Sequence, residues 1–177
     1  MKKDFLSFRI GPQGIEGEGG EIRGRIPASA EVWSGTGIEL LEPASLVARA
    51  SRTADGGLHV TGRLTFRARL ACRRCLREMS PTLDVALDLW FDPSVPEEEV
   101  EGPVYRVERG ASELDLAGPL REEALLALPE YPVCGEGCRG LCPHCGADWN
   151  EGPCECRGDD VDPRWNRLRR LMAEEQD

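Results

Sequence analysis

The chain has 177 residues, and a hydrophobic content of 40% supports one domain with a small appendage rather than global disorder. Its net charge of −10 argues against a protein that coats nucleic acid without specificity. No segment approaches the roughly 18 apolar residues of a membrane span, and the apolar run before Arg9 is shorter than the roughly 7–15 residues of a signal peptide. We therefore expect a cytoplasmic protein that does not enter a membrane.

The first half of the chain has the residue alternation of β-strands. Short strands and then a longer one are expected over residues 5–10, 21–27, 30–33 and 45–53. The sequence Asp55-Gly56-Gly57 is typical of a turn into the longest strand, residues 58–72. Its even positions are apolar and its odd positions are mostly polar, which predicts one buried face.

A second alternating run over residues 82–91 follows, and a short strand is expected at 104–107. A helix is predicted from 116 to about 128, with Asp115 as its cap and Pro129 as its end. Its apolar stripe is expected to pack against the sheet, and it is formed by Leu116, Leu120, Ala124, Ala127 and Leu128.

These elements predict an α+β fold. We expect a β-rich antiparallel meander that curls toward a barrel or sandwich, with the helix packed on it, over residues 1–130. Residues 131–177 are expected to form a cysteine-rich zinc-binding module and a short C-terminal helix, packed on that core. Asp162 as N-cap and Pro163 as the first helical residue signal this helix, and the acidic run at 96–103 is expected to be a solvated loop.

Eight cysteines form four close pairs: Cys72 and Cys75, Cys134 and Cys138, Cys142 and Cys145, Cys154 and Cys156. Zinc is held by thiolates that arrive in pairs from tight turns, so eight thiols match two structural Cys₄ sites. A disulfide framework is the alternative, but it needs an oxidising compartment. The expected cytoplasmic location therefore favours metal.

Two arrangements of the thiols are reasonable. In the arrangement that we prefer, the two C-terminal pairs close one site. Cys72 and Cys75, which are expected at the tip of the hairpin between the two alternating strands, share the other site with Cys134 and Cys138. In the alternative, the two middle pairs form one site and the two outer pairs form the other. Either way every position is filled by sulfur, which is typical of structural sites, because catalysis needs a vacant position.

Residues 49–77 carry eight arginines and a single acid, Asp55, although the chain as a whole is acidic. Local basicity of this kind can mark a surface that binds phosphates or an acidic partner, and an ordinary solvated strand face is the alternative. The candidate RNA- or partner-binding residues are Arg63, Arg67, Arg69, Arg73, Arg74 and Arg77. No nucleophile elbow, P-loop or dinucleotide fingerprint is present, so the sequence predicts an interaction protein rather than an enzyme.

Three segments in this order resemble the YceD family of large ribosomal RNA subunit accumulation proteins, from about Leu58 to the C-terminus. They are Cys72-Arg73-Arg74-Cys75-Leu76, the helix that begins after Leu114-Asp115-Leu116, and residues 140–150 followed by Cys154 and Cys156. The resemblance implies a cytoplasmic bacterial factor needed for accumulation of large-subunit ribosomal RNA. Its expected partners are a large-subunit precursor, ribosomal RNA or a ribosomal protein, with no small-molecule substrate.

Two other functions remain open at this point. Cys72 and Cys75 could act in thiol-redox chemistry or zinc sensing, because the flanking Arg73 and Arg74 would favour a reactive thiolate. The acidic surface could instead chaperone a basic ribosomal protein, in which case the arginines would be incidental.

Overall fold

The computed structural model describes residues 6–11, 14–15, 21–96, 104–156, 165 and 171. The chain forms two compact units, the first made of residues 1–72 and 77–132 and the second of 73–76 and 133–177. The predicted C-terminal helix and most of the predicted acidic loop lie outside the described residues.

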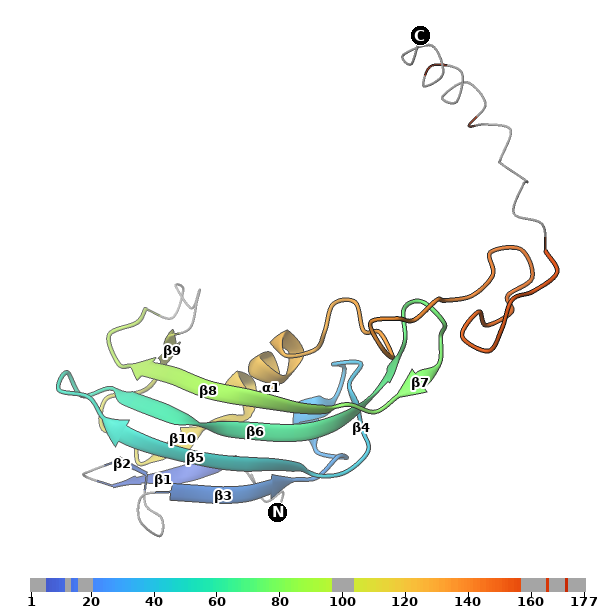
Figure 1. Ribbon diagram of the computed structural model, residues 1–177. Coiled ribbons are helices and arrows are strands. Elements are labelled where there is room, and N and C mark those ends of the chain that lie inside the picture. The colour runs from blue at the N-terminus through green and yellow to red at the C-terminus, as the bar shows by residue number, and fades with distance from the viewer. Residues whose placement is uncertain are drawn as a thin grey trace. The chain divides into compact units, whose positions relative to one another are not determined.

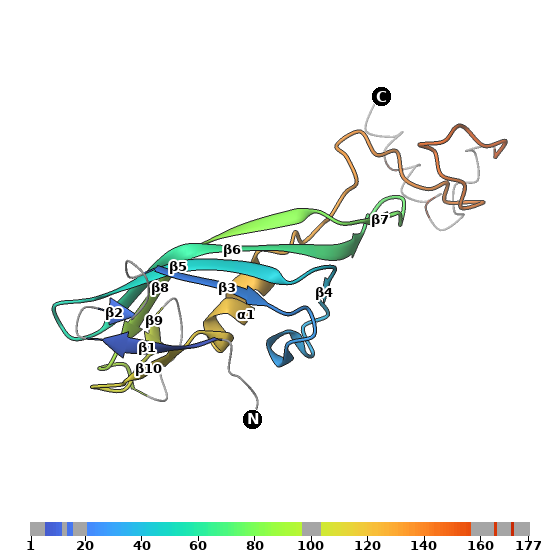
Figure 2. The same cartoon turned by 90° about the horizontal axis from the view of Figure 1, so that it is seen from below.

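The first unit is built on a mixed β-sheet (Figure 1). The strands are β1 Ser7–Gly11, β2 Gly14–Ile15, β3 Glu21–Ile26, β4 Glu39–Leu40, β5 Ala44–Arg52, β6 Leu58–Ala71, β7 Glu78–Met79, β8 Thr82–Asp92, β9 Val104–Arg106 and β10 Glu113–Asp115. Their order is β10-β1-β2-β5-β6-β8-β9, while β3 runs along β5 (Figure 2) and the short strands β4 and β7 both pair with β6.

The three long strands β5, β6 and β8 form the centre of this sheet and confirm the predicted alternation. Leu64 of β6 lies opposite Leu46 of β5 and Val85 of β8, and all three side chains are buried. Phe66, two residues further on, is only 1% exposed. One face of the sheet therefore carries the hydrophobic core, and the odd-numbered positions of β6 lie on the other face.

Two predictions about the sheet are wrong in detail. It is not purely antiparallel, because β9 pairs with β8 in parallel. Residues 30–33 do not form a strand but a 3₁₀ turn, η2 Glu31–Trp33. A residue far along the chain stabilises this turn, because Arg121 donates hydrogen bonds of 2.7 and 2.6 Å to the carbonyls of Val32 and Ser34. The sequence of residues 30–33 alone does not contain this long-range contact, so the pattern could not predict the turn.

The helix α1, Ala117–Leu126, confirms the predicted position but is shorter than expected. The predicted cap is displaced by one residue, because the N-cap is Leu116, which makes no side-chain capping hydrogen bond. Asp115 lies just before it, and its carboxylate accepts a hydrogen bond from the backbone N–H of Ala117 at 2.8 Å. Leu116, Leu120 and Ala124 are fully buried in the core. Among the helices in the described residues, none has the length and apolar character that crossing a membrane would require.

Candidate metal centres

The first candidate centre gathers the thiols of Cys72, Cys75, Cys134 and Cys138. Their sulfur atoms all lie within 4.8 Å of one another, and Cys75 and Cys134 are 3.7 Å apart. Four thiolates at about 2.3 Å from a tetrahedral ion would stand roughly 3.8 Å from each other. A disulfide would bring two sulfurs to about 2.05 Å. All eight cysteines are free thiols, so the group fits a tetrahedral metal ion.

The second candidate centre gathers Cys142, Cys145, Cys154 and Cys156, again within 4.8 Å of one another. The thiols are therefore grouped as in the preferred arrangement from sequence, and not as middle and outer pairs. The centres differ in accessibility. In the first, Cys72, Cys75 and Cys138 are buried, whereas in the second only Cys142 is buried and both Cys145 and Cys156 are exposed. His144, which lies between two cysteines in the sequence, belongs to neither group and is exposed.

Both C-x-x-C segments have the same backbone form. In each, the N–H of the first cysteine donates to the carbonyl five residues later, at 2.9 Å from Cys72 to Arg77 and at 2.8 Å from Cys142 to Ala147. The residue after the second cysteine is left-handed, with φ of 59° at Leu76 and 74° at Gly146. The chain thus reverses so that both thiols face one point. Glycine at position 146 adopts this positive φ without strain, but leucine in the sequence gives no such signal at position 76.

Replacing Leu76 by glycine and Gly146 by alanine should change the zinc affinity in opposite directions. Leu76→Gly is expected to strengthen zinc binding by about 0.5–1 kcal/mol. Glycine removes the strain that leucine has at positive φ in the folded turn, and this gain outweighs the conformational freedom that glycine adds to the unfolded chain. Gly146→Ala should weaken it by about 1 kcal/mol. No atom lies within 4 Å of a Cβ built at Gly146, so backbone conformation alone would decide that result. Zinc affinity measured by chelator competition is the readout, and two shifts of the same sign would contradict the shared geometry.

Hydrogen bonds to sulfur support both centres. The Asn150 amide donates to Cys138 Sγ at 3.6 Å, and the Trp149 indole N–H donates to Cys154 Sγ at 3.5 Å. The indole lowers the pKa of Cys154 to about 6, whereas a hydrogen bond with Cys145 raises the pKa of Cys156 to about 12. The four thiols therefore do not all ionise by themselves, and a cation would compensate their charge. No sequence signal indicated that Asn150 would contact a thiol.

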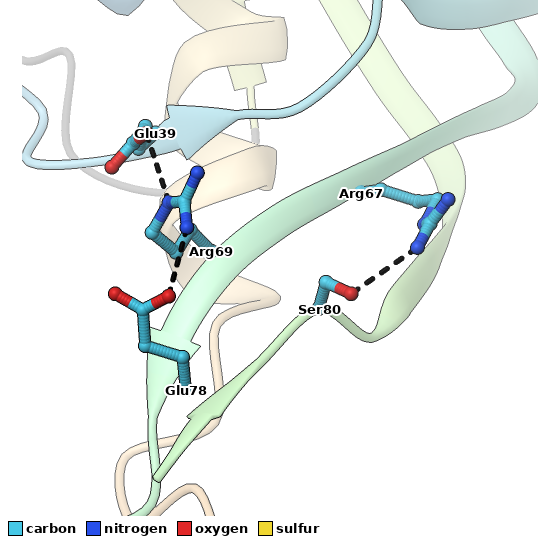
Figure 3. Close-up of polar contacts among 5 residues, drawn as sticks. All are labelled: Glu39, Arg67, Arg69, Glu78 and Ser80. Carbon is cyan, nitrogen blue, oxygen red and sulfur yellow. Dashed lines mark hydrogen bonds and ion pairs between the residues drawn. The ribbon is translucent and has the colours of Figure 1, made fainter. Parts of the chain in front are cut away.

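The predicted arginines on β6 lie on the exposed sheet face, where nearby carboxylates engage them (Figure 3). Arg69 lies 2.9 Å from both Glu39 and Glu78, and these carboxylates raise the pKa of its guanidinium. Arg67 donates to Ser80 at 3.2 Å and lies 4.0 Å from Glu42.

Arg63 is the most exposed of these three arginines, at 61% of its side chain. Its ion pair with Asp84, at 3.8 Å, is looser than the two 2.9 Å pairs of Arg69, and it lacks the hydrogen bond that Arg67 donates to Ser80. Among the β6 arginines it is therefore the one best placed to take a new anionic partner.

The remaining predicted arginines lie at the hairpin tip and are all exposed. Arg74 has an internal role, because it donates to the Cys138 carbonyl at 3.0 Å and to the Glu136 carbonyl at 3.4 Å. The Arg77 carbonyl accepts the Cys72 hydrogen bond that closes the turn. Arg73 makes no ion pair or hydrogen bond with the described residues.

A family model described as large ribosomal RNA subunit accumulation protein YceD matches residues 60–172. Uncharacterized proteins of Mycobacterium bovis and of Mycobacterium tuberculosis H37Rv are each 35% identical to the chain over 124 residues. These matches cover 68% of this chain and 58% of each relative, so the chain spans less than two thirds of the curated relatives' length. No solved structure matches the chain.

Proposed function

Because the chain belongs to the YceD family of large ribosomal RNA subunit accumulation proteins, we propose that it is a non-enzymatic factor in large ribosomal subunit biogenesis. It acts as a zinc-stabilised cytoplasmic scaffold that contacts a large-subunit precursor through ribosomal RNA or a ribosomal protein. The observation that carries this proposal is the family match, which spans both C-x-x-C turns and all eight cysteines.

Zinc is the metal that we propose for both centres. Each centre offers four thiolates at spacings suited to a tetrahedron, and closed all-sulfur sites are typical of structural zinc. Four thiolates leave no position for water or substrate, which supports a scaffold rather than a catalyst. Asn150 and Trp149 would orient the thiolates of the first and second centre, respectively.

The proposed RNA- or partner-binding residues are the six arginines predicted from the sequence. The contacts of five of these arginines within the protein separate them into two kinds. Arg67, Arg69 and Arg74 already hold internal partners, which an anionic ligand would have to displace. Arg63 and Arg73 are more available, so among these six arginines they should contribute most to contact with a particle.

The thiol-redox alternative through Cys72 and Cys75 has less support. A redox cysteine must be accessible to an oxidant or a partner thiol. Cys72 is 0% exposed and Cys75 is 6% exposed, and both lie within the four-thiol group. Their place in that group supports metal binding, so they should resist alkylation until a chelator is added.

Sedimentation of the tagged chain from growing cells tests the proposed function. We expect it to migrate with large-subunit precursors at low salt and to leave them at moderate salt, because phosphate contacts weaken with ionic strength. The double variant Arg63→Glu and Arg73→Glu should move toward the top of the gradient. The matched control with lysine at both positions keeps the charge and should migrate like the parent chain.

Two outcomes would count against the proposal. If the parent chain stays at the top of the gradient at both salt concentrations, it does not bind precursors stably. If it migrates with the particles and the glutamate variant does so equally well, then the particle is contacted by residues other than Arg63 and Arg73.

A further inference from the structure

The register of β3 on β5 creates a second group of arginines that the sequence pattern did not reveal. Arg23 lies opposite Val47, Arg25 opposite Ser45, and Arg49 opposite Glu21. Opposite residues of antiparallel strands share a face, and the intervening Ile22, Leu46 and Ala48 are buried. Arg23, Arg25 and Arg49 therefore project together from the solvent side of the sheet, and we call them the β3–β5 arginine face.

This face has more free positive charge than the β6 arginines. Arg25 and Arg49 are exposed and make no ion pair or hydrogen bond with the described residues. Arg23 has a single acidic partner, Glu21 at 3.2 Å, and its side chain is 75% exposed. Arg69, by contrast, is 42% exposed between two carboxylates. A new anion at the β3–β5 face would displace only one existing pair.

A hollow of about 250 Å³ lies within the same face. It is lined by Arg23, Gly24, Arg25, Ser45, Leu46 and Val47. Two guanidiniums and the Ser45 hydroxyl thus border an open space on one strand pair, and these are donor groups that bind phosphate oxygens.

We propose that the β3–β5 arginine face binds the phosphate backbone of RNA. This inference rests on the proposed function and gives its partner a chemical class. Phosphate recognition by guanidinium requires no particular base, so binding is expected to depend on salt more than on sequence. Arg63 lies opposite Val47 on the next strand, so it borders the face and could extend the track of bound phosphates across the sheet.

Binding of the zinc-loaded full chain to a fluorescent oligouridine of about 16 nucleotides is the test. In the double variant Arg25→Glu and Arg49→Glu, affinity at low salt should fall at least about tenfold. The slope of log K against log salt should flatten by about 1.4, because two phosphate contacts on a single strand are lost. Lysine at both positions should preserve the slope.

Glutamate at position 49 would face Glu21, so glutamine at positions 25 and 49 is a second variant that removes charge without adding repulsion. It should lose affinity in the same direction while keeping the circular dichroism of the parent. If both variants bind RNA like the parent while Arg63→Glu with Arg73→Glu does not, the inference is wrong and the proposed function stands. If the parent chain binds polyglutamate with the same affinity as RNA, the face does not select a phosphate backbone and the inference also fails.

Discussion

Chelation of zinc is expected to unfold residues 133–156 while leaving the sheet of the first unit folded. Residues 133–156 contain one isolated bridge, Leu141 with Asp148, and otherwise turns and irregular segments. The members of the hydrophobic core cluster all belong to the first unit. Structural zinc contributes about 10–16 kcal/mol to small modules, and little else in these residues would replace it.

Hydrogen exchange with and without chelator measures this directly. The amides of Cys142 and Trp149, which donate to the Ala147 and Gly140 carbonyls, should lose protection on chelation. Amides of Val60 and Leu64 in the central strand should keep theirs, because the core around them contains no metal ligand. Unchanged protection at Cys142 after complete metal removal would show that the module folds without an ion.

A matched pair of variants separates loss of a ligand from damage to the loop. Cys145→Ser should reduce the zinc content from two ions per chain to one, because Cys145 belongs to the second group. His144→Ser changes the exposed neighbour in the same turn and should leave both ions in place. Equal zinc content in the two variants would contradict the assignment of Cys145 as a ligand.

The predictions from sequence were strongest where the signal is local and periodic. The long strands and α1 followed from alternation and from an apolar stripe, because burial of one face imposes these periods directly. The pairing of cysteines also followed from close spacing in the chain. Two arrangements of the pairs into sites were open, because the choice depends on distances in the folded chain, and the structure groups the thiols as in the preferred one.

The features that were missed depend on contacts between distant residues. Arg69 reads as a free cation in the sequence, but Glu39 lies 30 residues away and reaches it only because β4 pairs with β6. Arg23 and Arg25 stand outside the basic segment, and the register of β3 brings them to Arg49. Asn150 approaches Cys138 through a turn that a one-dimensional pattern does not encode.

Gly62→Ala is expected to destabilise the sheet by about 2–3 kcal/mol, although it adds a single methyl group. Gly62 lies at the centre of β6, paired with Ala48 of β5 and Leu87 of β8. A Cβ at this position would meet the Val47 carbonyl oxygen and would lie 2.7 Å from Ala48 Cα. Both are backbone atoms of a paired strand, so the clash is not relieved by rotating a side chain.

The control for this variant is Gly24→Ala, which adds the same methyl group to a strand glycine that has nothing within 4 Å of its Cβ position. It should be neutral or stabilise the protein by up to about 1 kcal/mol, because alanine restricts the unfolded chain more than glycine does. Urea denaturation of the zinc-loaded chain should therefore give a clearly lower midpoint for Gly62→Ala alone. Equal midpoints would mean that β5 and β6 can separate at little cost, and that the close approach of these strands is not what requires glycine at position 62.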